Sequence, residues 1–185
     1  RNIFKKRKYL KEYHRWINNN KLLTPHLVKQ KLIIDLAKKY NIKIFIESGT
    51  FKGDMIEAVK HIFSEIYSIE LSENLFLKAK KRFYFEKKIH LISGDSGKKI
   101  NDILKLINAP AIFWLDGHYS NGNTALGKKM TPIYKELENI FNYKDYEHII
   151  IIDDARLFGV EKDYPTINEL TTFIKDKRSN LNIHI

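Results

Sequence analysis

Short apolar runs alternate along the chain with longer segments in which apolar residues recur every three or four positions. A short apolar run that ends in a polar or glycine-containing turn is typical of a buried β-strand, whereas the longer spacing is typical of an amphipathic helix. The five strand-like runs are 42–47, 66–70, 89–93, 111–116 and 148–153. The alternation predicts successive βαβ units, and therefore an α/β three-layer sandwich with a mostly parallel central sheet.

The segments between these runs carry apolar residues on one helical face. The faces are Met55, Ile56, Val59, Ile62 and Phe63; Leu75, Phe76, Ala79 and Phe83; and Ile100, Ile103, Leu104 and Ile107. Pro25 and Pro132, each preceded by threonine, mark the start of a helix. Thr166 with Glu169 three residues later predicts a capping box at the start of the last helix.

All of the net positive charge of +11 lies in the N-terminal part of the chain. Residues 1–43 hold 13 Lys and Arg against Glu12 and Asp35, whereas the remainder holds 20 basic and 20 acidic residues. We expect residues 1–23 to form a basic helical segment and residues 24–185 to form the main domain. The basic segment has two interpretations, a solvated helix or a surface for phosphates and anionic membranes.

The composition is that of an ordinary globular domain, with 43% hydrophobic and 30% charged residues. The chain has no cysteine, which excludes disulfides, thiolate metal sites and a cysteine nucleophile. No apolar run approaches the roughly 20 residues of a membrane-spanning helix. We therefore expect a cytoplasmic protein without a membrane span, and the sequence leaves a homo-oligomer open.

Polar residues follow the predicted strands at the edge where parallel sheets bind ligands. The first strand leads into Glu47 and a loop with Gly49 and Gly53, and the second ends in Glu70, whose carboxylate suits a ribose diol. These features fit any nucleoside-type cofactor, NAD included. A G-x-G-x-x-G fingerprint is absent, however, and the acidic Glu47 would repel a pyrophosphate. Glu47 instead favours a ligand with a cationic amine or sulfonium, such as S-adenosylmethionine.

Several fragments, in this order, resemble the signatures of a small bacterial group of class I S-adenosylmethionine-dependent methyltransferases. They are Glu47-Ser48-Gly49-Thr50, Gly53-Asp54, Tyr67-Ser68-Ile69-Glu70, Gly94-Asp95-Ser96-Gly97, the run FWLDGHYS at 113–120, Ile152-Asp153-Asp154-Ala155-Arg156 and Asp163-Tyr164-Pro165-Thr166. The resemblance implies a Rossmann-like sheet of seven strands with the last antiparallel. A sixth strand then fits 181–185, and the last strand is missing from the chain. Met130 replaces an acidic residue of the family pattern, so no role is carried over to it.

The expected cofactor site gathers residues from the first four strand ends. Glu70 would hold the ribose hydroxyls, and Asp95 would accept a hydrogen bond from the adenine amine. The full set is Glu47, Gly49, Thr50, Gly53, Asp54, Glu70, Asp95, Ser96 and Asp116.

The expected catalytic residues are Asp116, Asp153 and His118, from the ends of the fourth and fifth strands. A neutral imidazole suits His118 to the role of general base. Asp116, Asp153 and Asp154 offer oxygen ligands for a divalent cation such as Mg²⁺, in a pattern that also resembles metal-dependent catechol and sugar O-methyltransferases. The alternative is that these acids orient the cofactor's ammonium group without a metal.

The sequence thus predicts methyl transfer from S-adenosylmethionine to the hydroxyl of a sugar, a glycan precursor or a related small metabolite. Two alternatives stay open. A nucleic-acid methyltransferase would use the basic N-terminal segment to bind RNA, and a non-catalytic nucleotide-binding module would bind the cofactor without turnover.

Overall fold

The structure, a computed structural model, describes residues 2–19, 24–116, 131–143, 145–161 and 164–185. Its helices are α1 (Asn2–Asn18), α2 (His26–Lys39), α3 (Asp54–Val59), α4 (Glu73–Arg82), α5 (Ser96–Leu104), α6 (Ile133–Asn142) and α7 (Ile167–Lys177), with a short 3₁₀ helix η1 (Ala155–Leu157). Its strands are β1 (Ile44–Ser48), β2 (Glu65–Glu70), β3 (Ile89–Ser93), β4 (Ala111–Leu115) and β5 (Ile149–Ile152).

The five strands of the described residues form one sheet in the order β3-β2-β1-β4-β5, and every neighbouring pair is parallel. Ser48 at the end of β1 pairs with Ile69 of β2 and with Leu115 of β4. Leu115 in turn pairs with Ile152 of β5. The carboxyl ends therefore lie side by side, and the α/β sandwich with a parallel sheet is confirmed.

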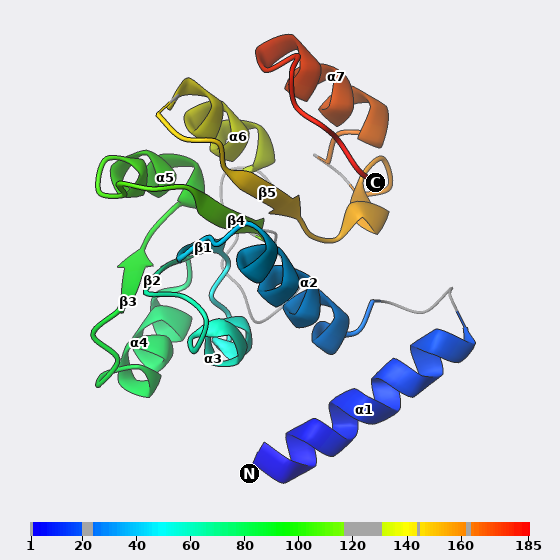
Figure 1. Ribbon diagram of the computed structural model, residues 1–185, viewed down its shortest axis with the longest axis vertical. Coiled ribbons are helices and arrows are strands. Elements are labelled where there is room, and N and C mark those ends of the chain that lie inside the picture. Colours follow the sequence, from blue (N-terminus) through cyan, green and yellow to red (C-terminus); the bar gives the residue numbers. More distant parts are fainter. Residues whose placement is uncertain (1, 20–23, 117–130, 144, 162–163) are drawn as a thin grey trace.

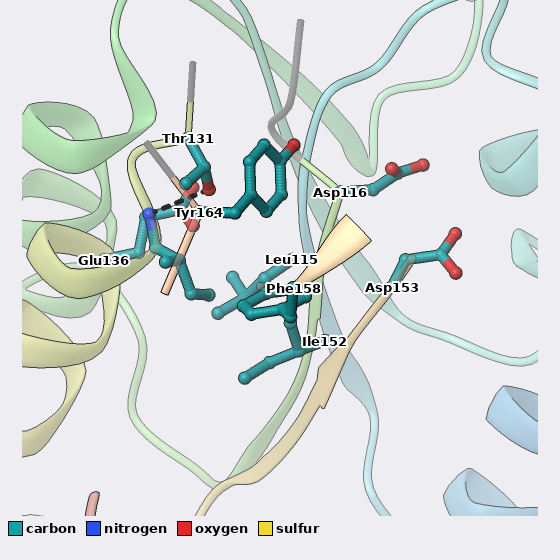
Figure 2. A pocket seen from close by; sticks show the side chains of 9 residues that line it. Leu115, Asp116, Thr131, Glu136, Ile152, Asp153, Phe158 and Tyr164 are labelled. Carbon is teal, nitrogen blue, oxygen red and sulfur yellow. Dashed lines mark hydrogen bonds between the residues drawn. The ribbon is translucent and has the colours of Figure 1, made fainter. Parts of the chain in front are cut away.

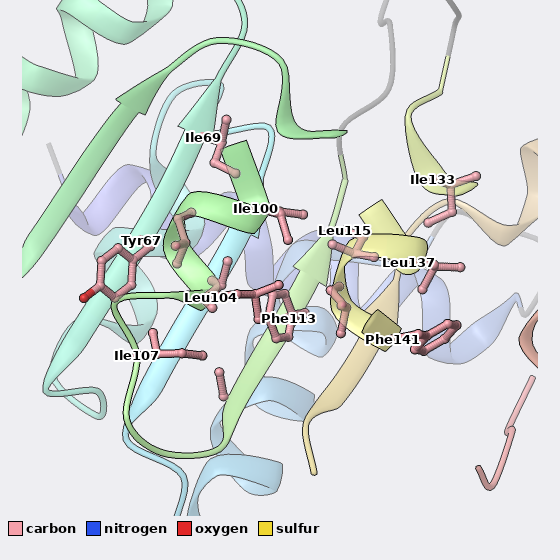
Figure 3. Close-up of a cluster of buried hydrophobic side chains, with 14 of the residues drawn as sticks. Tyr67, Ile69, Ile100, Leu104, Ile107, Phe113, Leu115, Ile133, Leu137 and Phe141 are labelled. Carbon is pink, nitrogen blue, oxygen red and sulfur yellow. The ribbon is translucent and has the colours of Figure 1, made fainter. Parts of the chain in front are cut away.

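The helices cover both faces of this sheet (Figure 1). Helices α5, α6 and α7 lie on one side, and α2, α3 and α4 lie on the other. Side chains alternate between the faces because successive residues of a strand point in opposite directions. Ile46 and Phe113 thus belong to the core under α5 and α6 (Figure 3), whereas Phe45 and Trp114 belong to the core under α2 and α3.

The order of helices and strands follows the predicted order, with ends displaced by one or two residues. Helix α3 ends at Val59, and Phe63, expected on its apolar face, is buried just after the helix. The threonines before Pro25 and Pro132 behave differently from each other. Thr131 Oγ1 accepts from the Ile133 amide at 3.3 Å, whereas the start of α2 at Pro25 has no side-chain cap.

The predicted sixth strand is wrong: residues 181–185 have no strand conformation. After α7 the chain turns, with the Leu181 amide donating to the Arg178 carbonyl at 3.2 Å. The Lys175 ammonium binds the Leu181 carbonyl. Leu181 and Ile183 pack against the core on the α5–α6 side, so apolar contacts and these two hydrogen bonds hold the segment without strand pairing.

Helix α1 packs against the start of the domain through one face. Tyr9, Tyr13 and Trp16 are half-buried, while Arg7 and Lys11 are exposed. The Tyr9 ring lies 5.7 Å from the His26 ring at the start of α2. Within the described residues, no helix combines the length and the apolar character needed to cross a membrane.

Candidate active site

The loop after β1 is folded back toward β2 by two glycines in the left-handed region. Gly49 has φ 85° and Gly53 has φ 70°, conformations that cost glycine little. The Gly49 amide donates to the Ile69 carbonyl at 2.9 Å, which ties the loop to the end of β2. A Cβ on Gly53 would lie 2.6 Å from the Phe83 ring, so the close approach of α4 also requires glycine here.

Glu70 is the point where this loop meets β2. Its carboxylate accepts from the Phe51 amide at 2.7 Å and from the Ser72 amide at 2.9 Å. Burial raises the pKa of Glu70, and the backbone amides act in the opposite direction. Each carboxylate oxygen has two acceptor positions. Glu70 can therefore hold a ligand diol while it also binds the loop after β1 and the segment after β2.

Glu47 is buried on the side of the sheet covered by α2 and α3. The Ser68 hydroxyl donates to Glu47 Oε1 at 2.7 Å, and it lies 2.5 Å from the Thr50 hydroxyl. Burial raises the pKa of Glu47 to about 8, and the charges of Asp116 and Glu70 add to the effect despite the Ser68 hydrogen bond. A carboxyl of this kind is neutral near pH 7 until a cation approaches it.

Asp95 and Ser96 lie where α5 begins, after β3. The Asp95 side chain caps the helix by accepting from the Gly97 amide at 2.9 Å, and Ser96 is buried. Asp54 begins α3 and accepts from the Arg82 guanidinium at 2.8 Å. Both carboxylates therefore bind groups of the protein itself, and their predicted cofactor contacts stay predictions.

Asp116 and Asp153 end neighbouring strands and point the same way (Figure 2). The Asp116 amide donates to the Ser48 carbonyl at 3.2 Å, and the Asp153 amide donates to the Leu115 carbonyl at 3.0 Å. These bonds continue the sheet pattern past the ends of β4 and β5. The structure thus brings together two of the three predicted catalytic residues, whereas His118 lies outside the described residues.

The predicted Mg²⁺ site at Asp116, Asp153 and Asp154 is not assembled. Among the described residues, no three His, Cys, Asp or Glu side chains are placed to hold a metal ion. Lys29 of α2 supplies the cation instead, with its ammonium 2.5 Å from Asp153 and 4.0 Å from Asp154. Asp154 has a left-handed backbone and also pairs with Arg156 at 3.3 Å. Within the part of the chain that the structure describes, these acids are therefore not arranged to hold a divalent cation.

Sequence reasoning missed three residues at this edge, namely Lys29, Glu136 and Tyr164. The Lys29 ammonium lies 5.9 Å from the centre of the Trp114 ring as well as against Asp153. The sequence held one signal for Lys29 and Glu136, because each is a charged residue on the apolar face of a helix. Lys29 is four residues before the buried Ile33, and Glu136 lies between Ile133 and Leu137.

A small pocket lies at the ends of β4 and β5 (Figure 2). Its lining residues are Leu115, Asp116, Thr131, Ile133, Glu136, Ile152, Asp153, Phe158 and Tyr164. The Tyr164 hydroxyl is buried and makes no hydrogen bond among the described residues. Burial raises the pKa of Tyr164, and the Asp154 and Asp116 charges act in the same direction. Polar groups thus converge on an otherwise apolar hollow, as in many small-molecule sites.

No protein-family model and no curated protein sequence matches this chain. Similar solved structures do exist. The O-methyltransferase TomG of Streptomyces achromogenes, solved with S-adenosylmethionine, is 14% identical with a TM-score of 0.59, over 91% of this chain and 75% of that one. The methyltransferase PaMTH1 of Podospora anserina, solved with S-adenosylhomocysteine, is 16% identical with a TM-score of 0.53, over 92% and 72%.

A third similar structure is the methyltransferase domain of the bacterial protein CtHen1-C. It is 14% identical with a TM-score of 0.53, over 82% of each chain. At these identities the likeness establishes the fold. The chain has the Rossmann-like fold of class I S-adenosylmethionine-dependent methyltransferases.

Proposed function

We propose that this protein is an enzyme that transfers a methyl group from S-adenosylmethionine to an acceptor hydroxyl. The observation that carries the proposal is Glu70, which is buried at the end of β2 and held by the Phe51 and Ser72 amides. A carboxylate in this position beside the glycine loop suits the ribose diol of an adenosine-containing cofactor. The likeness in fold to structures solved with this cofactor or its demethylated product supports the same proposal.

Glu47 would serve the charged end of the cofactor. The residue is 1% exposed and lies next to the end of β1, beside the loop with Gly49. A neutral buried carboxyl that ionises next to an ammonium or sulfonium stabilises a cationic ligand more than a neutral one. Gly49, Thr50, Gly53 and Asp54 would shape this loop, while Asp95 and Ser96 would lie near the adenine.

On the acceptor side, Asp116 and Asp153 present oxygens that accept hydrogen bonds from hydroxyls, and Lys29 adds a donor. This mixture favours a hydroxyl-rich acceptor, which is the support for a sugar, a glycan precursor or a related small metabolite. His118 would take the acceptor proton. The acceptor oxygen would attack the methyl carbon in line, and the carbon–sulfur bond would break with its electron pair staying on sulfur, so that the sulfonium becomes a neutral thioether.

A nucleic-acid acceptor is the second candidate, because α1 exposes a cationic face. Arg7, Lys8, Lys11 and Arg15 are all exposed on that helix. Such a face can follow a phosphate backbone, and the binding would then weaken steeply with salt. The third candidate, a binding module without turnover, predicts cofactor binding and no methylated product.

The test is methyl transfer from isotopically labelled S-adenosylmethionine, read by mass spectrometry of the acceptors. Hydroxyl-bearing sugars, nucleotide-activated sugars and RNA oligonucleotides are offered separately to the purified protein. We expect labelled sugar-type products and none from RNA. Methylated RNA would establish the second candidate, and cofactor binding with no product from any acceptor would favour the third.

A further inference from the structure

A buried acid on α6 lies against both loops that would hold the cofactor. Glu136 is 1% exposed and lines the pocket at the ends of β4 and β5. Its carboxyl lies near the Ser48 hydroxyl at the end of β1 and the Ser96 hydroxyl at the start of α5. These serines begin the two loops assigned to the charged end and to the adenine of the cofactor. Glu136 would therefore lie at the floor of the proposed cofactor site, on the side opposite Glu47.

This carboxyl lacks a full set of hydrogen bonds. Among the described residues, no hydrogen bond of good geometry reaches Glu136 Oε1, although the Ser48 and Ser96 hydroxyls lie close enough to lower the pKa of this carboxyl. Leaving a buried polar group unpaired costs about 1–3 kcal/mol. Unpaired groups of this kind at the edge of a binding site indicate that a ligand completes them.

The surroundings of Glu136 are acidic. Asp95 faces it from the loop before α5 and Asp116 faces it from the end of β4, while Asp153 and Tyr164 line the same pocket. No Lys, Arg or His is among the described residues that line this pocket. Burial raises the pKa of Glu136 to about 7, and the charges of Asp95 and Asp116 act in the same direction. The nearby hydroxyls of Ser96 and Ser48 lower the pKa of Glu136.

We infer that Glu136 is a specificity-determining residue that distinguishes the cationic methyl donor from its neutral demethylated product. The inference rests on the proposed function. S-adenosylmethionine carries two positive charges, on its sulfonium and its ammonium, and one negative charge on its own carboxylate. S-adenosylhomocysteine has lost the sulfonium charge. In the ligand-free protein Glu136 holds a proton below about pH 7. The positive charge of the donor favours the carboxylate, so the proton leaves when the donor binds and returns after the methyl group is transferred.

The sign of the pH dependence follows from this exchange. Below about pH 7 the donor must displace a proton from Glu136, so donor affinity is weaker there and rises as the pH increases. A single group of this kind gives about a tenfold rise in donor affinity between about pH 6 and pH 8. The affinity for the product changes much less, because the product brings no sulfonium charge.

The experiment is titration calorimetry with S-adenosylmethionine and with S-adenosylhomocysteine, across this pH range. Two buffers of different ionisation enthalpy measure the protons released. For the wild-type protein we expect proton release and a rising affinity with the donor only. Glu136→Gln should lose the rise near pH 7 and reduce the ratio of donor to product affinity. Glu138→Gln is the matched control, because Glu138 lies on the same helix, pairs with Lys135 at 2.9 Å and does not line the pocket, so this variant should keep the rise near pH 7.

Equal pH profiles for donor and product in the wild-type protein would overturn the inference, even if Glu136→Gln does not fold. The same proton release in wild type and in Glu136→Gln would also overturn it. Glu136→Asp, which keeps the acid, should retain the donor-specific rise. If the wild-type protein binds neither ligand at any pH, the proposed function itself fails.

Discussion

At the scale of single residues, Lys29 provides the positive charge beside the acids that follow β5. The Lys29 and Asp153 side chains are 20% and 11% exposed, so their ion pair is shielded from water. Removing one partner of a shielded pair leaves the other charge without compensation. Lys29 therefore holds Asp153 in the site as a hydrogen-bonding group.

We expect Lys29→Met to lower the free energy of unfolding by about 1–3 kcal/mol, because Asp153 would lose its cation. Chemical denaturation measures this change. Lys31→Met is the matched control, since Lys31 lies on the same helix and pairs with Asp35 at the same 2.5 Å, but with side chains 75% and 55% exposed. The control should change stability little. Equal losses in the two variants would contradict a shielded pair.

Some side chains of the candidate site could be predicted from the sequence, and others could not. The positions of Glu47 and Glu70 were predictable because Glu70 ends a buried strand and Glu47 is the residue before the last of another, and the edge of a parallel sheet fixes where such residues lie. Lys29 was not predictable as a partner of Asp153, because 124 residues separate them. The ion pair of Asp153 with Lys29 was not predictable for the same reason, and the Mg²⁺ site stays a prediction.

At the scale of the helices and strands, local patterns predicted the five strands because each is a short apolar run between polar turns. The capping box at Thr166 and Glu169 is present as predicted. The sixth strand failed because strand formation needs a pairing partner, which the local sequence cannot supply. Leu181 and Ile183 bury against the core without pairing, so the same residues satisfy their apolar character in another way.

Helix α1 gives the prediction at this scale: removal of residues 1–20 should weaken cofactor binding by less than about tenfold. Its described contacts with the domain include Tyr9, which lies against His26 and whose pKa is raised by burial and by Asp54. Asp54 keeps its Arg82 partner when α1 is absent. Calorimetry on the shortened and full chains measures the change. Tyr9→Phe, which removes only the hydroxyl, serves as the control.

A complete loss of cofactor affinity in the shortened chain would show that α1 belongs to the cofactor site. A loss confined to RNA binding would instead assign α1 to the nucleic-acid alternative.

At the scale of the whole molecule, the sheet places two buried acids on opposite faces of β1. Glu47 lies on the α2–α3 side and Glu136 reaches the α5–α6 side of Ser48. Both carboxyls have a raised pKa, to about 8 and about 7, and burial is the first cause in each case. The fold thus raises the pKa of acidic groups around the ends of the central strands, where a cationic cofactor would favour their ionised form.

The most direct test of the account is the binding of S-adenosylmethionine and S-adenosylhomocysteine to the intact chain, measured by calorimetry. We expect both ligands to bind, and Glu70→Ala to weaken both by about 10- to 100-fold, because each has the ribose diol. Glu73→Ala, an exposed carboxylate three residues further along, should leave both affinities unchanged. Failure of the wild-type protein to bind either ligand, or an unchanged affinity in Glu70→Ala, would contradict the account.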